Sequence, residues 1–151
     1  MRRSNVPVRV SLAKESTLAG YSNTPLVKKL GLKEGSQFYV HGSPVEYNTL
    51  LGTLPDNTVQ KNRLGKNVDF VHYFTKSQNE LEKFLPRALD AISRSGMIWI
   101  SWPKKSSKIL SDVSEDTIRS AALPIGLVDV KVCAVDNIWS GLKLVIRKEL
   151  R

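Results

Sequence analysis

Hydrophobic and polar positions follow two patterns along this chain, one with the period of a strand and one with the period of a helix. Short runs that are dense in β-branched and aromatic residues predict strands. These runs are residues 36–40, 58–60, 68–75, 97–102, 127–135 and 142–148. The last two are separated by a short segment with Asp, Asn and Gly, which predicts a terminal antiparallel hairpin.

Helical patterns lie between the predicted strands, and the first two are short. Thr24 suits an N-cap, Pro25 the first helical position and Gly31 a left-handed stop, which predicts a helix of about two turns. A second helix is expected over residues 43–51, where Gly52 closes it.

The later helices carry clearer signals. From Ser77 the apolar residues follow helical spacing as far as Gly96, which we expect to end the helix. Pro86 lies inside this stretch and predicts a kink or two abutting helices. Ser114 is followed by two acidic residues, which favours the start of another helix, and residues 123–126 predict its end.

This order of elements predicts an α/β fold. Alternating strands and helices favour a Rossmann-like, mostly parallel sheet with right-handed crossovers and helices on both faces, and the C-terminal antiparallel hairpin makes the sheet mixed. A chain of 151 residues has the usual length of one domain. We expect residues 1–20 to form a flexible basic N-terminal arm and residues 21–151 to form a single Rossmann-like domain.

Composition narrows the class of protein and of partner. The chain has 23 Lys and Arg against 14 Asp and Glu, a net charge of +9, which favours anionic partners; a solubilising surface with a basic arm is the alternative. Cys133 is the single cysteine, so no intramolecular disulfide can form. No stretch has the roughly 20 apolar residues that cross a bilayer, and no signal peptide is visible. We therefore expect a cytoplasmic protein without a membrane partner.

The predicted arrangement resembles the class I methyltransferase fold, a Rossmann-like sheet that ends in an antiparallel strand. The resemblance covers residues 32–148. Its most specific parts are the strand at residues 68–71, the helix, glycine and strand of residues 89–100, and residues 126–130 before the hairpin. It implies a cofactor edge at the carboxyl ends of the strands.

Three longer stretches resemble a narrower group. They read AGYSNTPLVKKLG, ISWPKKSS and GLVDVKVCAVDNIWSGLKLVIRKEL. These strings are similar to a bacterial family of small proteins that is catalogued only as a domain of unknown function. The similarity implies a bacterial origin and a methyltransferase-like fold, and it implies no particular activity.

The S-adenosylmethionine motifs that the resemblance implies are missing. A methyltransferase has a Gly-rich turn after the first strand, and here residues 41–44 read HGSP with one glycine. The acid that would end the second strand is absent from residues 59–63, VQKNR. The motif that follows the fourth strand of a methyltransferase is replaced here by residues 74–77, FTKS. We expect no bound S-adenosylmethionine and no other cofactor.

Other familiar chemistries also lack their residues. The chain contains no GxGxxG, no P-loop and no GxSxG elbow. His41, His72 and Cys133 lie far apart without ligand spacing, so we expect no metal. We expect His72 to be a hydrogen-bonded residue of the core or sheet surface, Cys133 a small buried residue and Trp99 a core residue.

Topology predicts one candidate ligand site. The carboxyl ends of the parallel strands and the hairpin turn share one edge, where open α/β sheets bind ligands. The residues expected there are His41, Gly42, Ser43, Trp102, Lys104, Lys105, Ser106, Asp136, Trp139 and Ser140. Two lysines and several hydroxyls would hold an anion such as phosphate or carboxylate, and two Trp rings would form a flat apolar wall. The alternative is a solvated loop in which both rings close the core.

These observations favour a noncatalytic ligand- or partner-binding or regulatory domain that recognises a small anion, a nucleotide or a protein. One alternative is a small transferase with an unorthodox site formed by His41, Lys104, Lys105 and Asp136. Another is nonspecific nucleic-acid binding through the basic arm and residues 28–29. Fold class alone does not separate these functions.

Overall fold

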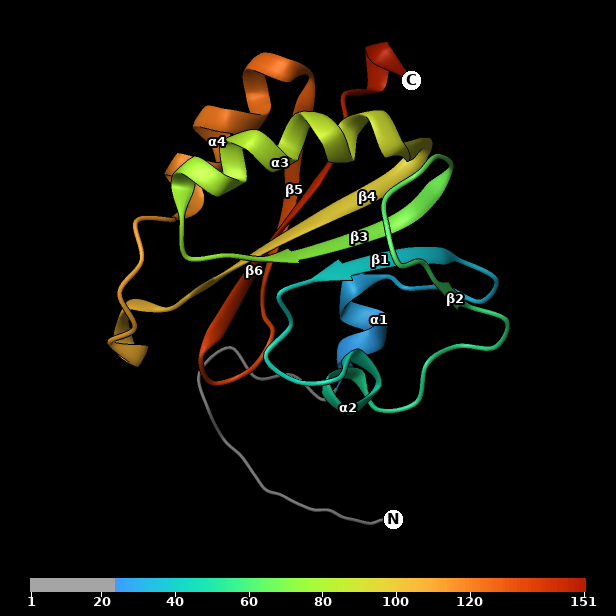
Figure 1. Cartoon of the computed structure of the whole chain (residues 1–151), viewed down its shortest axis with the longest axis horizontal. Coiled ribbons are helices and arrows are strands. Elements are labelled where there is room, and N and C mark those ends of the chain that lie inside the picture. Colours follow the sequence, from blue (N-terminus) through green and yellow to red (C-terminus); the bar gives the residue numbers. More distant parts are fainter. Residues whose placement is uncertain (1–23) are drawn as a thin grey trace.

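A six-stranded sheet lies between two layers of helices in the computed structural model, which describes residues 24–151 (Figure 1). The strands are β1 (Gln37–His41), β2 (Val59–Gln60), β3 (Val68–Phe74), β4 (Ile92–Pro103), β5 (Leu127–Ala134) and β6 (Trp139–Ile146). Their order in the sheet is β2-β1-β3-β4-β6-β5, and only β6 runs antiparallel to its neighbours. The predicted mixed, Rossmann-like sheet with a C-terminal hairpin is confirmed. The expected arm, residues 1–20, lies outside the described residues.

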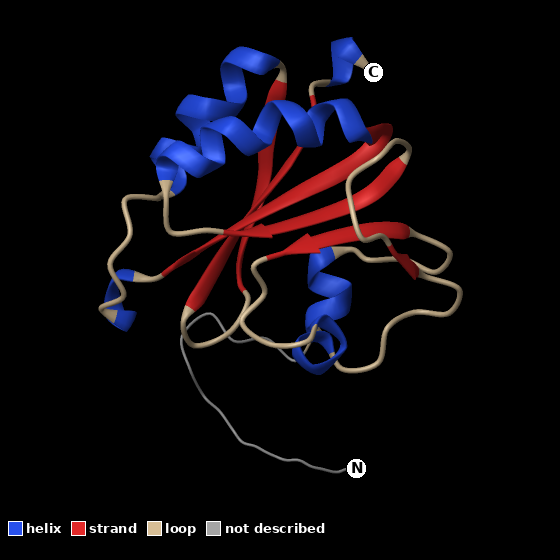
Figure 2. Ribbon diagram, in the orientation of Figure 1, coloured by secondary structure: helices blue, strands red, loops and turns tan. Residues whose placement is uncertain are grey.

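Helices cover the sheet unequally (Figure 2). The elements are α1 (Leu26–Leu30), α2 (Tyr47–Leu51), α3 (Gln78–Ala91) and α4 (Glu115–Ala122), with 3-10 turns η1 (Lys105–Ser107), η2 (Leu123–Ile125) and η3 (Lys148–Leu150). Helices α3 and α4 lie on one face, which we call the α3–α4 face, and α1 and α2 lie on the other, the α1–α2 face (Figure 1). No described helix is long and apolar enough to span a bilayer.

Side-chain caps explain where the longer helices begin. Ser77 accepts a hydrogen bond from the Glu80 amide at 3.2 Å, at the first turn of α3. Ser114 and Thr117 form a reciprocal capping box at the start of α4, which confirms the predicted helix start. Helix α3 continues through the exposed Pro86 as one element, so of the two predicted outcomes, a kink or two abutting helices, the second is wrong.

The predicted helix over residues 43–51 is shorter than expected. It begins only at Tyr47, because the Ser43 hydroxyl donates to the Val45 carbonyl at 2.6 Å and holds a local turn in place of a first helical turn. Gly52 ends the helix as predicted, with φ at 86°. Gly31 likewise ends α1 in the left-handed region, with φ at 82°.

Gly96 does not end α3, which contradicts the prediction. The helix ends at Ala91, and Gly96 lies inside β4, five residues after that helix, near a register shift against β3. A Cβ on Gly96 would lie 3.0 Å from the carbonyl oxygens of Ser93 and Val68. The glycine therefore permits a close approach of two backbones within the sheet.

Two hydrophobic cores fill the space between the layers. The core on the α3–α4 face contains Leu81, Leu85, Ile98, Ile100 and Ile118, each fully buried. The core on the α1–α2 face is more aromatic and contains Phe38, Tyr47, Phe70, Phe74 and Trp99. Trp99 is fully buried, as predicted, and its indole N–H donates to the Leu30 carbonyl at 2.7 Å.

Candidate functional site

The carboxyl ends of β1, β3 and β4 meet the turn between β5 and β6 at one edge of the sheet (Figure 1). The tertiary structure brings two of the three predicted groups of site residues into contact there. The Lys104 amide donates to the Ile138 carbonyl at 2.7 Å, which joins the end of β4 to the hairpin turn. His41, Gly42 and Ser43 lie at the end of β1, two strands away from β4.

Lys104 and Asp136 are engaged in holding the hairpin. The Asp136 carboxylate accepts backbone hydrogen bonds from Ile138 at 2.8 Å and Trp139 at 2.7 Å, which closes the turn. The Lys104 ammonium donates to the Asp136 carbonyl at 3.0 Å and is half-buried. Lys104 and Asp136, two of the three charged residues of the predicted site, therefore have structural hydrogen bonds of their own.

Lys105 and Ser106 are the exposed members of the same loop. Both lie in η1 and face solvent, and Ser107 donates its hydroxyl to the Lys104 carbonyl at 2.6 Å. Ser140 is half-buried and pairs with Trp102 across the β4–β6 ladder. Ligand binding by this loop stays a prediction.

The two predicted Trp rings do not form one wall, which corrects the expectation. Trp102 belongs to the core of the α3–α4 face, whereas Trp139 packs against the core of the α1–α2 face. The reason is the pleat: Trp139 pairs with Pro103 and Ser140 pairs with Trp102, so the two rings belong to successive rungs that point to opposite faces. Each ring closes a different core, and the Trp139 ring lies edge-on to the Phe74 ring, with ring centroids 5.4 Å apart.

The turn after β1 packs directly against the end of β3. Gly42 has φ at 78°, and a Cβ at this position would lie 2.6 Å from the Phe74 carbonyl oxygen. His41 is exposed and stacks on Tyr73, with ring centroids 5.1 Å apart. Because β2 lies on one side of β1 and β3 on the other, these two strand ends form the topological switch point, where the fold usually opens a crevice. Here the backbone of the turn lies against the end of β3.

A cavity of about 370 Å³ lies beside this turn, at the ends of β1 and β2. Ser43, Glu46, Tyr47 and Gln60 contribute to its lining. Glu46 is the one carboxylate in that lining, and it precedes α2 instead of ending β2. The residue after β2 is Lys61, whose ammonium donates to the Lys66 carbonyl at 3.3 Å. An acid in the ribose-binding position of the fold is therefore missing.

A fully buried histidine lies beneath the same edge. The His72 Nδ1 atom is 2.6 Å from the Tyr47 hydroxyl, and its Nε2 atom is 2.7 Å from the Ser101 hydroxyl. One ring nitrogen donates and the other accepts, so the neutral ring satisfies both hydroxyls. Burial lowers the pKa of His72 to about 3, which keeps the ring neutral at neutral pH. The predicted hydrogen-bonded core role of His72 is confirmed.

This chain of hydrogen bonds resembles the order of groups in a serine hydrolase, but it cannot act as one. His72 and Ser101 each have 0% of their surface exposed, so no substrate reaches the hydroxyl. The sequence did not predict Tyr47 and Ser101 as partners. Ser101 carried a weak signal, since it is a hydroxyl residue inside an apolar strand. Tyr47 carried no signal, because its contact with His72 depends on how α2 packs against the sheet.

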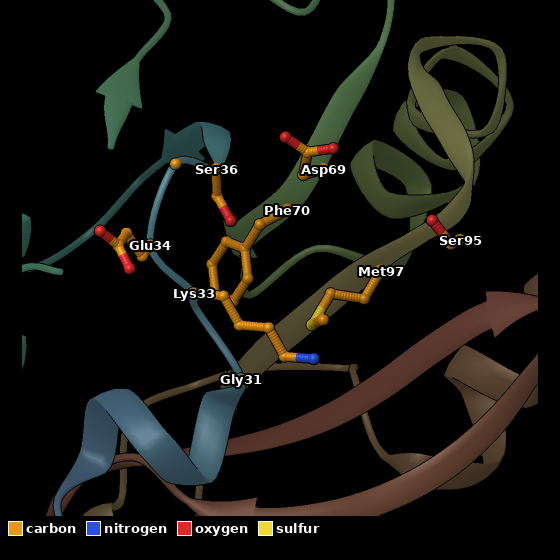
Figure 3. Close-up of a pocket in the computed structure, with 9 residues that line it drawn as sticks. Gly31, Lys33, Glu34, Ser36, Asp69, Phe70, Ser95 and Met97 are labelled. Carbon is orange, nitrogen blue, oxygen red and sulfur yellow. The ribbon is translucent and has the colours of Figure 1, made fainter. Parts of the chain in front are cut away.

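A second cavity, of about 350 Å³, lies at the opposite edge, before β1 and β3 (Figure 3). Its lining includes Lys33, Glu34, Asp69 and Met97. The Asp69 carboxylate accepts a hydrogen bond from the Gln37 amide at 2.8 Å, so one of its oxygens is already engaged. The sequence did not predict this cavity, because the loop over residues 31–36 forms it at the amino edge of the sheet. Ligands of open α/β sheets are expected at the carboxyl edge.

The remaining candidates for chemistry are the thiol of Cys133 and possible metal-binding groups. Cys133 is half-buried where the sequence predicted a small buried residue, because β5 is an edge strand and its α1–α2 side is only partly covered. Burial raises the pKa of its thiol, against the lowering effect of Lys29 and Lys131. No group of three or more His, Cys, Asp or Glu residues within 24–151 could hold a metal ion.

Residues 50–148 match the sequence profile of a family described as a protein of unknown function, DUF3052. The chain belongs to this family. The match begins inside α2 and ends just after β6, so it includes β2 to β6 and leaves the Lys33 loop and β1 outside. The family assignment agrees with the resemblance that the sequence strings indicated. No curated protein sequence matches this DUF3052 chain.

Solved methyltransferase structures share the fold of this DUF3052 chain. Magnesium protoporphyrin IX methyltransferase from Synechocystis PCC 6803, with bound SAM, has a TM-score of 0.55 at 13% identity, covering 81% of this chain and 74% of that protein. A SAM-dependent methyltransferase from Aquifex aeolicus has a TM-score of 0.53 at 19% identity, covering 81% and 88%.

TrmN from Thermus thermophilus is similar as well, with a TM-score of 0.51 at 12% identity over 81% of this chain. The chain spans only 47% of the length of TrmN. All three identities are low, so the similarity is one of fold. It confirms the methyltransferase-like, Rossmann-like architecture.

Proposed function

We propose that this chain is a noncatalytic binding module built on a methyltransferase-like scaffold. One observation carries the proposal: the turn after β1 lies against the end of β3, with a virtual Cβ of Gly42 only 2.6 Å from the Phe74 carbonyl oxygen. Methyltransferases of this fold need an open, Gly-rich turn at the switch point, so that backbone can approach the cofactor. A turn that is packed onto the neighbouring strand end supports loss of that role.

The surrounding side chains support the same conclusion. The strand that would supply a carboxylate to a ribose ends in Gln60 and is followed by Lys61. The buried hydroxyl and imidazole of Ser101 and His72 satisfy one another, away from solvent. None of these groups is in a position to transfer a proton to or from a bound substrate.

An anionic ligand suits the module best. The net charge of +9 attracts anions over a distance, and Lys105 and Ser106 present an ammonium group and a hydroxyl to solvent at the carboxyl edge. A transferase acting through His41, Lys104, Lys105 and Asp136 is supported less well, because Lys104 and Asp136 already hold the hairpin turn.

Calorimetric titration of the full chain with S-adenosylmethionine tests the proposal. We expect no measurable binding, with a methyltransferase of the same fold as the positive control. A dissociation constant below about 100 μM, which corresponds to about 5.5 kcal/mol, would overturn the proposal. If such binding occurs, its loss in Glu46→Gln would show that the cavity beside β1 is a working cofactor site.

A further inference from the structure

Lysine side chains gather on the α1–α2 face, next to the C-terminal end of α1. Lys131 on β5 and Lys143 on β6 are directly opposite each other in the antiparallel ladder. Directly opposed side chains on neighbouring strands have Cβ atoms about 5 Å apart, and like charges in this position destabilise the sheet. Lys143 also pairs with Trp99 on β4, which places the two lysines on the same face as the Trp99 ring.

Lys33 belongs to the same cluster. It lines a cavity together with Met97, and Met97 lies on the α1–α2 side of β4, two residues from Trp99, the partner of Lys143. The pKa of Lys143 is lowered first by burial and then by the charges of Lys131 and Lys33. The ion pairs between described residues all involve Arg119, on the α3–α4 side of the sheet, and none reaches these lysines. No described carboxylate therefore forms an ion pair with any of the three lysines.

A structural role accounts for one of the three lysines. The Lys131 ammonium donates to the Lys29 carbonyl at 2.8 Å, near the end of α1, where a cation stabilises the helix dipole. No comparable bond to another residue of the described range 24–151 explains Lys143, which is half-buried and whose pKa is lowered by burial and by the charges of Lys131 and Lys33. Charged groups held together at a cost to stability are a common sign of a binding site.

The cluster adjoins the cavity at the amino edge. Lys33 lines this cavity together with Met97 and Asp69, and its side chain extends past Met97, away from Glu34 (Figure 3). A volume of about 350 Å³ is enough for a small organic ligand. The Met97 thioether and the Phe70 ring supply apolar lining, and the serine and carboxylate groups around them supply polar contacts.

We propose that Lys33, Lys131 and Lys143 bind the phosphate group of a small molecule whose remaining part lies in the cavity between Met97 and Asp69. Phosphate carries the charge needed to relieve the repulsion among the three ammonium groups, and lysine binds it well as a point charge. A small ligand fits better than a nucleic acid, because the cluster adjoins a cavity of about 350 Å³. The inference goes beyond the proposed function, because it places a ligand at the amino edge and names its class, and it rests on the binding role.

Thermal unfolding and NMR titration of the full chain with inorganic phosphate test this site. Sodium chloride at the same ionic strength is the reference. Lys143→Gln and Lys33→Gln remove site charges, and Lys83→Gln removes an exposed charge on α3 as the matched control. We expect phosphate to raise the Tm of the wild type and of Lys83→Gln, and to bind about tenfold more weakly to each site variant. Equal affinity in all four proteins would overturn the proposal.

Two further titrations identify the source of the phosphate group. Ribose 5-phosphate and AMP should bind more tightly than inorganic phosphate, with chemical-shift changes at Met97 and Asp69. A single-stranded oligonucleotide that binds more tightly than all three, with the same sensitivity to Lys143→Gln, would overturn the assignment to a small molecule. The S-adenosylmethionine titration is independent, so the proposed function and this site can fail separately.

Discussion

The two faces of the sheet differ in the side chains that form their cores. Helices α3 and α4 cover one face with a core of mostly aliphatic side chains, and the polar groups on that side, such as Arg119 with Asp129, stay at the rim. The other face has two helices of five residues each, and it buries His72 and Ser101 among aromatic rings. The same face holds the lysine cluster.

The difference follows from helix length. A helix of 14 residues such as α3 presents several apolar turns, and these turns cover a strand along its whole length. Helices of five residues cover little, so the rest of the α1–α2 face is closed by large rings or left partly open. Polar groups are tolerated there because they have partners or reach solvent. The candidate chemistry of this protein therefore lies mainly on the weakly covered face.

The largest expected effect comes from removing the buried histidine. His72→Ala should lower the free energy of unfolding by about 4 kcal/mol, because it leaves a cavity and two hydroxyls without partners. Leu85→Ala on the α3–α4 face should cost about 3 kcal/mol through the cavity alone. Denaturant unfolding measures both. Combining His72→Leu with Tyr47→Phe and Ser101→Ala should recover part of the loss, and no recovery would contradict a cost from unpaired hydroxyls.

Acid should weaken the wild type through the same residue. The pKa of His72 is about 3 in the folded state against 6.5 as its ordinary value, so the unfolded chain binds a proton over a range where the folded chain does not. Stability from this residue is complete above pH 6.5 and falls as the pH drops toward 3. At about 1.4 kcal/mol per pH unit, the loss between pH 7 and pH 4 is about 3 kcal/mol.

His72→Gln isolates this contribution, since glutamine keeps hydrogen-bonding capacity without the titration. The free energy of unfolding of both proteins is measured at pH 7 and at pH 4. The carboxylates affect both proteins alike, so the wild type should lose about 3 kcal/mol more than the variant. Parallel losses would contradict a neutral, buried ring.

The closed turn at the carboxyl edge can be tested with two glycines of the same backbone conformation. Gly42 has φ at 78° and Gly35 has φ at 77°, but only Gly42 would meet another atom within 4 Å on gaining a Cβ. Gly35→Ala should cost about 1 kcal/mol from backbone strain. Gly42→Ala should cost about 2–3 kcal/mol, because the Phe74 carbonyl must also move. Equal changes in thermal stability would remove the main support for a filled switch point.

The smallest expected effect is an increase in thermal stability. Lys143→Met should raise the Tm at neutral pH, since it removes a half-buried charge beside Lys131 and Lys33. The pKa of Lys143 is lowered, so the cost is present below the folded pKa and disappears as the pH rises toward 10.5. The gain should therefore shrink at pH 10. Lys83→Met on α3 is the control, and an equal gain there would contradict a specific cost at the cluster.

Local sequence signals predicted the elements well where a single segment decides its own structure. The capping serine of α4 is followed at once by its acidic turn, and the strand at Val68–Phe74 is dense in branched and aromatic residues. The prediction that Gly96 ends the helix was wrong, because a glycine suits both a helix end and a close approach of two strands. Only the neighbouring strand distinguishes these roles.

The candidate site was only partly predictable for a similar reason. Topology placed Lys104 and Asp136 at one edge, but it did not reveal that both hold the hairpin turn. The positions of the two Trp rings depended on the register of β4 against β6, and a shift by one residue moves a side chain to the other face. The lysine pair required the same register in the hairpin, which includes a bulge before Lys131.

The sequence by itself determined the class of fold, the order of the elements, the basic charge and the lack of the cofactor motifs, because periodicity and composition are properties of the chain alone. Tertiary structure decided which residues meet: Tyr47 with His72 and Ser101, the turn at Gly42 with the end of β3, and Lys131 with Lys143. These contacts join residues far apart in the sequence. Their geometry depends on strand register and helix length, which the packed sheet sets as a whole.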